Sequence, residues 1–386
     1  MKLLEYQAQT LMKMYGVPVP GGCVIAEGAD IESELAGSGI GYPAVVKAQV
    51  QIGGRGKAGG IRFAQDAAQA KREAEDLLGK EIRGLTVHKV YLVEKQEYVS
   101  EWYLSILLDR LSKQPMILFS SMGGMEIEET AKTAPDKIKR IVVDPMIGVE
   151  DYMARYLLSS SGLDVSCTKA LDQLLKGLYR CFREKDCMLA EINPLVVRED
   201  GKLIALDGKI DVDDSALYRQ PEVKAWREEL PEEDLVKEAR EFDFLYIPIE
   251  KGGSVAVCSN GSGMLMSCID MLSKNGMVVS AALDLGGGAT KERIAEALRI
   301  LFATQGVKAV LINIFGGITR CDEVAGGIEL AMSRGALEGK MIVVRMEGTN
   351  KDKAIEILNG MKNDDVIRVD GLRESIAAML ERRDRL

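Results

Sequence analysis

A lysine inside an apolar segment is the first residue whose position suggests chemistry. Lys47 lies in the run AVVKAQV (residues 44–50), and GGRGKAGG (residues 53–60), with five glycines around Arg55 and Lys57, follows it. A charge in an apolar strand is costly unless it faces a cleft or an anion. Glycine-rich backbone approaches phosphates closely, although the P-loop pattern GxxxxGK[ST] is absent. The combination favours phosphate binding over a flexible surface loop.

Two oxygen-bearing side chains suggest a metal site. Asn193 in EINPL (residues 191–195) and Asp207 in LDGK (residues 206–209) are fourteen positions apart. The intervening segment, VVREDGKLIAL, is typical of a hairpin, which would place the two residues side by side. Amide and carboxylate oxygens suit Mg²⁺, which shares its ligands with nucleotide phosphates. The alternative is an Asx turn before Pro194 and an ordinary hairpin.

Three glycine-containing turns in the second half suggest an anion site. NGSG (residues 260–263), GGGAT (286–290) and GGIT (316–319) each precede a predicted helix. Helix N-termini carry partial positive charge and free N–H groups, which attract phosphates and carboxylates. One such turn needs glycine for its geometry alone, but three in one domain indicate that an anion binds there.

The chain has a single histidine, His88, at the entry to a predicted strand. We interpret it as a structural or surface residue. A reaction that needs a histidine nucleophile would therefore have to take that histidine from another chain.

The elements that would position these residues differ between the two halves. In the first half, apolar runs at residues 42–50, 89–94, 103–108 and 115–120 alternate irregularly with charged helical stretches. Residues 208–243 are strongly polar and predict a solvated connector with one or two surface helices. From residue 252 onward, five strand-then-helix units with fully apolar strands predict a flavodoxin-like, doubly wound parallel sheet. Ligands bind such sheets at the carboxyl ends of their strands.

Composition excludes several classes of protein. The 386 residues carry a net charge of −9, which disfavours nucleic-acid binding. The seven cysteines are scattered without a CxxC pair, which argues against a disulfide framework and a zinc site. The N-terminal segment is typical of an amphipathic helix rather than a signal peptide, and no apolar run is long enough to span a membrane. We expect a soluble, cytoplasmic protein.

Five motifs together resemble one family from end to end, the β subunits of succinyl-CoA synthetase (succinate–CoA ligase). The motifs are VVKAQVQIGGRGKAGG, EINPLVV, LDGKIDVDDSALYRQPE, LDLGGGATKERI and NIFGGITRCD. The resemblance implies a two-lobed α+β ATP-grasp domain at residues 1–240. It also implies a flavodoxin-like CoA-ligase domain at residues 245–386, so the whole chain would be an α/β protein.

The resemblance also implies roles for individual residues. The residues that would hold the nucleotide phosphates are Lys47, Gly54, Arg55 and Gly56. Those that would border the nucleotide are Glu94, Glu97 and Glu101. Asn193 and Asp207 would ligate Mg²⁺, and Glu191 would steady a histidine loop of the partner. The acid substrate would meet Asn260, Gly317, Ile318 and Thr319.

In this family, ATP phosphorylates a histidine of the α subunit, the phosphate passes to succinate, and CoA displaces it. The resemblance therefore implies an α-subunit partner, in an αβ or α2β2 assembly, and a CoA site mainly on that partner. Malate–CoA ligase and citryl-CoA synthetase subunits remain alternatives, as does a regulatory subunit that has lost catalysis.

Thr319 replaces an apolar β-branched residue that is common in bacterial relatives, and a hydroxyl there would matter for a hydroxylated acid or would be neutral. Pro20 resembles the ATP-using members rather than the GTP-using ones.

Overall fold

The chain forms two compact units, residues 1–229 and 230–386, in the computed structural model. The structure describes residues 1–52, 54–56, 58–230 and 232–385. Gly53 and Lys57, which belong to the predicted phosphate loop, lie outside the described residues. Each unit is considered by itself below.

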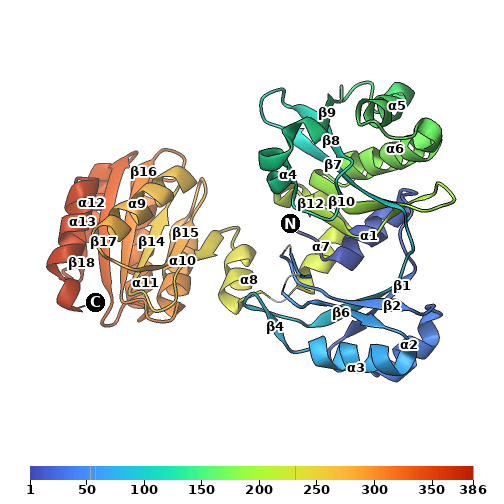
Figure 1. Cartoon of the computed structure of the whole chain (residues 1–386). Helices are drawn as coiled ribbons and strands as arrows, with labels where there is room; N and C mark the ends of the chain where they lie inside the picture. Colours follow the sequence, from blue (N-terminus) through green and yellow to red (C-terminus); the bar gives the residue numbers. More distant parts are fainter. Residues whose placement is uncertain (53, 57, 231, 386) are drawn as a thin grey trace. The chain divides into compact units, whose positions relative to one another are not determined.

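The first sheet of unit 1 has four antiparallel strands in the order β1-β6-β2-β3. Its strands are β1 (Gly22–Ala26), β2 (Ala44–Ala48), β3 (Ile61–Ala64) and β6 (Lys89–Glu94). Helices α2 (Ile31–Ser38) and α3 (Ala67–Leu77) lie along one face (Figure 1). Val46 and Ala48 point into the core under these helices. Because side chains alternate along a strand, Lys47 points to the opposite face.

The second sheet of unit 1 has the order β11-β10-β7-β8-β9, and β12 also pairs with β10. Its strands are β7 (Ser100–Asp109), β8 (Gln114–Ser120), β9 (Ile138–Val142), β10 (Cys187–Val197), β11 (Leu203–Ala205) and β12 (Gly208–Val212). Helix α6 (Thr168–Glu184) packs on β7 and β10, and α5 (Asp151–Ser160) packs on α6 and β9. The N-terminal helix α1 (Glu5–Met14) packs on β12 and α6.

The remaining elements of unit 1 are short. They are β4 (Glu81–Ile82), β5 (Leu85–Thr86), α4 (Ile127–Thr133), α7 (Pro221–Glu228) and the 3₁₀ turns at residues 135–137, 165–167 and 214–219. The strands predicted in the first half are confirmed as β2, β6, β7 and β8. The predicted N-terminal helix and the hairpin after Asn193 are confirmed as well, the latter by the antiparallel pairing of β10 with β11.

Unit 2 contains a six-stranded sheet in the order β13-β15-β14-β16-β17-β18. The strands are β13 (Leu245–Pro248), β14 (Val255–Ser259), β15 (Val279–Asp284), β16 (Ala309–Gly316), β17 (Met341–Gly348) and β18 (Val366–Val369). The five predicted strands, β14 to β18, run parallel and in the flavodoxin-like order 2-1-3-4-5. The edge strand β13 is antiparallel and was not predicted, because LYIP is short and ends in proline.

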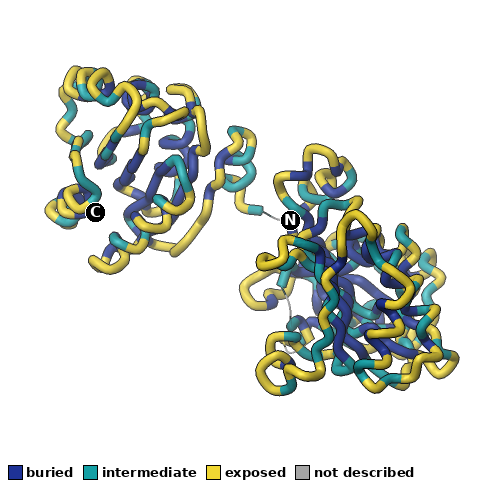
Figure 2. Tube along the Cα trace, turned by 90° about the horizontal axis from the view of Figure 1, so that it is seen from above, coloured by how far each residue is buried: buried dark blue, intermediate teal, exposed yellow. Residues whose placement is uncertain are grey.

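Helices cover both faces of this sheet, which makes it doubly wound as predicted. One apolar core lies under α10 (Lys291–Ala303), α11 (Cys321–Ser333) and α12 (Lys351–Gly360). The other lies under α9 (Ser262–Lys274) and α13 (Leu372–Glu381). In Figure 2 the strands form the buried layer within the helices. The glycine turns at residues 260, 286 and 316 all follow parallel strands at one edge.

The polar connector contains two helices, and the second of them belongs to unit 2. Helix α8 (Asp234–Glu241) packs on β13 and α10, and its Ala239 is fully buried with Phe244 in the unit 2 core. The boundary predicted at residues 240–245 therefore falls after this helix, whereas the compact units divide before it. The apolar face of α8 is too narrow to stand out from its charged residues.

Candidate functional site

Lys47 is buried against the N-terminal helix. Its Nζ donates to Glu5 Oε1 at 2.6 Å and to the Leu206 carbonyl at 2.8 Å. Lys47 is only 7% exposed, and Glu5, the first residue of α1, is 3% exposed. In the folded chain the anion that meets this ammonium group is therefore a carboxylate of the protein itself, and phosphate binding by Lys47 stays a prediction.

Arg55 joins the same cluster and extends it to the predicted metal ligand. Its Nη2 lies 2.9 Å from Glu5 Oε2 and 3.0 Å from Asp207 Oδ2, and its Nη1 donates to the Ala48 carbonyl at 3.1 Å. Two cations and two carboxylates thus balance in one place. Residues far apart in the sequence meet here because α1, β2 and the turn before β12 converge in unit 1.

The cluster perturbs the protonation of its members. Burial would raise the pKa of Glu5, but Lys47 and Arg55 outweigh burial and hold this pKa below its usual range. Burial and then the neighbouring Glu5 charge raise the pKa of Asp207 to about 6, and Arg55 and Lys47 oppose that rise only in part. Asp207 is the member for which ionisation is least favourable, although its side chain is 33% exposed. A cation arriving beside it would favour its charged form.

Asn193 lies beside Asp207, as the hairpin predicted. The Asn193 N–H donates to the Asp207 carbonyl at 3.2 Å. The Asn193 side chain accepts from the Gly124 N–H at 2.8 Å and donates to the Met125 carbonyl at 2.9 Å, so it also holds the turn that follows β8. Its Oδ1 keeps a second lone pair for a metal ion.

These donors fit Mg²⁺ better than a transition metal. Asn193 and Asp207 offer hard oxygen ligands, and Asp207 is partly accessible. Within the described residues, no group of three or more His, Cys, Asp and Glu side chains is arranged to hold a metal. An ion bound by Asn193 and Asp207 would therefore draw its other ligands from phosphates and water, which is how Mg²⁺ binds in nucleotide sites.

Of the other residues expected at the nucleotide, Glu94 lies against two glycines near the N-terminal strand. The Gly41 N–H donates to its Oε1 at 3.2 Å, and a Cβ added at Gly21 would lie within 3.6 Å of its carboxylate. Glu101 accepts from the Tyr98 hydroxyl, whereas Glu97 is exposed and pairs with Lys95 at 2.9 Å. None of the three contacts the Lys47–Arg55 cluster.

The predicted phosphate loop is only partly described. Gly54 has φ +70°, a left-handed conformation that favours glycine, and Gly56 is exposed. Backbone bonds from Ala58 and Gly60 to the Arg55 carbonyl fold this stretch back on itself. The loop therefore places Arg55 inward.

Glu191 lies on β10 and is half-buried. The Tyr103 hydroxyl donates to its Oε2 at 3.0 Å. Burial raises the pKa of Glu191, while Lys209 and the Tyr103 hydrogen bond lower it in part. Its carboxylate is thus held in a fixed direction by a neighbouring strand.

In unit 2 the structure brings together the four residues predicted to meet the acid. The Asn260 side chain donates to the Phe315 carbonyl at 2.7 Å and accepts from the Phe315 N–H at 3.1 Å. Gly317 and Ile318 are exposed on the next turn, Ile318 by 85%. Thr319 differs, because it is 1% exposed and its hydroxyl is bonded to the glycine turn at residues 286–288.

Sequence reasoning missed Glu5. Its segment, EYQAQTLMKM, was interpreted only as an amphipathic helix. The available signal was the unmatched Lys47, since a buried cation requires a buried anion, but nothing in the pattern said which carboxylate it would be. His88, by contrast, is exposed and pairs with Glu27 at 2.8 Å, as a surface residue would.

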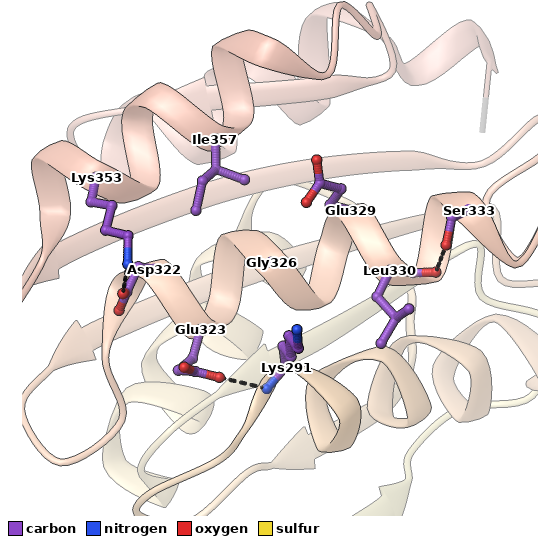
Figure 3. A pocket seen from close by; sticks show the side chains of 9 residues that line it. All are labelled: Lys291, Asp322, Glu323, Gly326, Glu329, Leu330, Ser333, Lys353 and Ile357. Carbon is purple, nitrogen blue, oxygen red and sulfur yellow. Dashed lines mark hydrogen bonds and ion pairs between the residues drawn. The ribbon is translucent and has the colours of Figure 1, made fainter.

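A pocket of about 620 Å³ lies over α11, between α10 and α12 (Figure 3). Two of its carboxylates have partners: Asp322 lies 3.0 Å from the Lys353 ammonium group, and Glu323 accepts from the Lys291 backbone N–H at 2.9 Å. Gly326 is one of its lining residues. None of the predicted site residues lines it.

Comparisons with known proteins agree with the two-part architecture. Residues 2–197 match the ATP-grasp domain family, and residues 258–370 match the CoA-ligase family. Among the described residues, no helix is both long and apolar enough to cross a membrane.

Several relatives match almost the whole chain. The β subunit of an ADP-forming succinate–CoA ligase from Chloroflexus aggregans is 45% identical over 363 residues, which are 94% of each chain. The corresponding subunit from Roseiflexus is 44% identical over 93% of each chain. A GDP-forming succinate–CoA ligase β subunit from Thermus thermophilus is 40% identical over 93% of this chain and 94% of its own.

Among solved structures, an ATP citrate lyase from Methanothrix soehngenii shares the fold, with a TM-score of 0.78 at 18% identity. The superposition covers 98% of this chain and 99% of that one. The identity is too low to carry its substrate across, whereas the succinate–CoA ligase subunits match at more than twice that identity. This chain belongs to the family of succinate–CoA ligase β subunits.

Proposed function

We propose that the chain is the β subunit of an ADP-forming succinate–CoA ligase, which joins an α subunit to couple ATP and ADP to the formation or cleavage of succinyl-CoA. One observation supports the chemistry above all others: Lys47, Arg55, Asn193 and Asp207 converge in unit 1. The partly exposed Asp207 carboxylate and the Asn193 amide oxygen beside it suit a catalytic subunit that binds a metal with its nucleotide.

Lys47 and Arg55 would hold the nucleotide phosphates, together with the backbone of Gly54 and Gly56. In the folded chain these two cations already bind Glu5 and Asp207. The phosphates would therefore compete with, or add to, internal carboxylates, and the basic groups are kept in place before the nucleotide arrives. Such preorganisation lowers the cost of orienting charges during phosphoryl transfer.

Asn193 and Asp207 would hold Mg²⁺, which offsets charge on the transferring phosphoryl group. Glu191 would steady the histidine loop of the α subunit through its carboxylate, which Tyr103 orients. Glu94, Glu97 and Glu101 would border the nucleotide. The three glutamates are separate from the basic cluster, which suits contacts to the nucleoside rather than to its phosphates.

The acid would bind at the carboxyl edge of the unit 2 sheet, near Asn260 and the Gly317–Ile318 turn. Phosphate carried by the α-subunit histidine would meet succinate there, and CoA would bind mainly on that partner. The phosphoryl group would have to pass from the nucleotide site to the acid site. A mobile loop that carries it would suit this separation of the two sets of residues.

Two points of specificity belong to this proposal. Succinate is favoured over malate and citrate because the relatives at 40–45% identity are succinate–CoA ligases. ATP is favoured over GTP because of Pro20, although one relative is GDP-forming.

The test is co-expression with the neighbouring α-like gene product, followed by thioester formation from CoA with succinate, malate or citrate and with ATP or GTP. Turnover of succinate that requires both chains supports the proposal. Turnover restricted to malate or citrate would instead assign a sister ligase, and no nucleotide binding at millimolar concentration would assign a non-catalytic subunit.

A further inference from the structure

Thr319 is a buried residue at the end of an exposed turn. Its side chain is 1% exposed, whereas Ile318 beside it is 85% exposed. The Thr319 hydroxyl accepts from the Gly288 N–H at 3.0 Å and donates to the Gly286 carbonyl at 3.3 Å. A hydroxyl has one proton to donate, so that proton is committed to the protein.

We propose that Thr319 is a positioning residue that fastens the Gly286–Gly288 turn to the Gly317–Ile318 turn, and that its hydroxyl does not contact the acid substrate. This inference rests on the proposed function, because it concerns the site assigned there to the acid. It replaces both earlier interpretations of this threonine. The hydroxyl would neither contact a hydroxylated acid nor be a neutral change, because it would hold the turn in position.

The Gly286–Gly288 turn needs such a fastening. Three consecutive glycines have more backbone freedom to lose than any other tripeptide, and both Gly286 (φ +66°) and Gly288 (φ +72°) adopt left-handed conformations. Added Cβ atoms at Gly286 and Gly287 would meet nothing within 4 Å, and one at Gly288 would meet only the exposed Ile318 side chain, at 3.4 Å, so side-chain packing contributes little to holding the turn. Hydrogen bonds have to order it.

A second anchor comes from the strand that precedes the turn. Asp284, the last residue of β15, is 9% exposed; its Oδ1 accepts from the Gly286 N–H at 3.0 Å and its Oδ2 from the Ser262 hydroxyl at 2.7 Å. Asp284 therefore ties this turn to the start of α9, and Thr319 ties it to the start of α11. The glycine turns that begin α9, α10 and α11 form one hydrogen-bonded set.

Burial and bonding together argue against a substrate role for the hydroxyl. A substrate acceptor would have to take the hydroxyl proton from the Gly286 carbonyl, which would then lose its partner. A substrate donor would have to reach the remaining lone pair of a residue that is only 1% exposed. The exposed atoms of this turn belong to Gly317 and Ile318. The acid would meet those residues, and Thr319 would set their position.

The experiment compares Thr319→Val and Thr319→Ser in the complex with the α subunit. Valine keeps the shape and removes the hydroxyl, and serine keeps the hydroxyl. Thr304→Val is the matched control. It also removes a threonine hydroxyl that is hydrogen-bonded, in this case to the Tyr246 hydroxyl at 2.9 Å, but at the opposite end of α10 from the glycine turn. The readouts are kcat and KM for succinate and malate, the nucleotide KM, and amide exchange of residues 286–289.

For Thr319→Val we expect kcat/KM to fall by about 3- to 10-fold for both acids alike, as one or two neutral hydrogen bonds would give. The nucleotide KM stays unchanged, amide exchange at residues 286–289 accelerates, and Thr319→Ser restores both properties. Thr304→Val leaves them unaltered.

A change in the malate-to-succinate ratio would show that the hydroxyl contacts the acid and would overturn the inference. Unchanged kinetics with unchanged amide exchange would overturn it as well. If the wild-type complex turns over none of the acids, the proposed function fails, while amide exchange alone still shows whether the hydroxyl orders the glycine turn.

Discussion

At the scale of single residues, the candidate nucleotide site is a charge-balanced cluster before any ligand binds. Lys47 and Arg55 are both more than 90% buried, and burying such charges is costly unless carboxylates accompany them. The accompanying carboxylates are those of Glu5 and Asp207. The residues that would bind phosphate are therefore also residues on which the stability of unit 1 depends.

Glu5 offers the first test of this dual role. Replacing Glu5 by alanine leaves two buried cations with only Asp207 beside them, so we expect the free energy of unfolding to fall by about 3 kcal/mol. Chemical denaturation measures this change. The control is Glu32→Ala, which removes an exposed ion pair to Lys71 and should cost less than about 1 kcal/mol. Equal losses in the two variants would mean that the buried cluster contributes no more than a surface pair.

Asp207 offers a test of the proposed metal site. Because its pKa is raised to about 6, its carboxylate is ionised above that pH and protonated below it. We therefore expect the affinity for Mg²⁺ with ATP to fall as the pH is lowered from 7.5 to 5.5, measured by titration calorimetry. Asp207→Asn should weaken binding and make this pH dependence shallower, while Asp200→Asn, on the exposed turn of the same hairpin, should do neither. Because the terminal phosphate of ATP also titrates in this range, the comparison is with the wild type: an equally steep pH dependence in Asp207→Asn would contradict the assignment.

Contacts between these residues could be predicted only where the partners are close in the sequence. The adjacency of Asn193 and Asp207 was predictable because one hairpin connects them. The partners of Lys47 and Arg55 were not, because Glu5 is 42 positions from Lys47 and Asp207 is 152 positions from Arg55. The inward direction of Thr319 was equally hidden, since a turn motif does not say which of its side chains is buried.

Among the elements of unit 2, helix α11 packs closely on its neighbour α10 in the same helical layer. Gly327 lies against α10, where an added Cβ would be 2.5 Å from Ile294 Cγ2 and 2.9 Å from the Lys291 carbonyl. Gly326, one residue earlier, borders the open pocket, and its added Cβ would have no contact closer than 3.7 Å. Adjacent glycines on one helix thus have different reasons to be there.

This pair makes a matched prediction. Gly327→Ala should destabilise the protein by about 1–3 kcal/mol, because α10 and α11 would have to separate. Gly326→Ala should be neutral or stabilising by up to about 1 kcal/mol, because alanine has the higher helix propensity and nothing obstructs it. Thermal unfolding of the two variants measures both changes. A destabilising Gly326→Ala with a neutral Gly327→Ala would contradict the packing.

Elements were more predictable than sites. The five parallel strands of unit 2 were identified because each is rich in apolar residues and is followed by a turn that contains glycine, a pattern typical of buried parallel strands. The sequence did not indicate strand β13, nor that α8 packs in unit 2. Each element has only a narrow apolar face, and the core residues that it contacts lie elsewhere in the sequence.

At the scale of the whole molecule, the proposed chemistry is divided between two units. Unit 1 holds the basic cluster and the proposed metal ligands, and unit 2 holds the turns that we propose bind the acid. The single histidine, His88, is a surface residue paired with Glu27 and contacts neither set. We therefore propose that the residue that carries the phosphoryl group belongs to another chain, which makes this chain one half of an enzyme.

The most direct measurement of that claim is succinyl-CoA formation by the chain alone, by its α-like partner alone, and by the two together, with ATP, Mg²⁺, CoA and succinate. We expect turnover only when both chains are present, together with ATP-dependent phosphorylation of a histidine on the partner. Turnover by this chain alone, or no turnover of succinate by the complex that phosphorylates its histidine, would contradict the proposed division of the reaction between two chains.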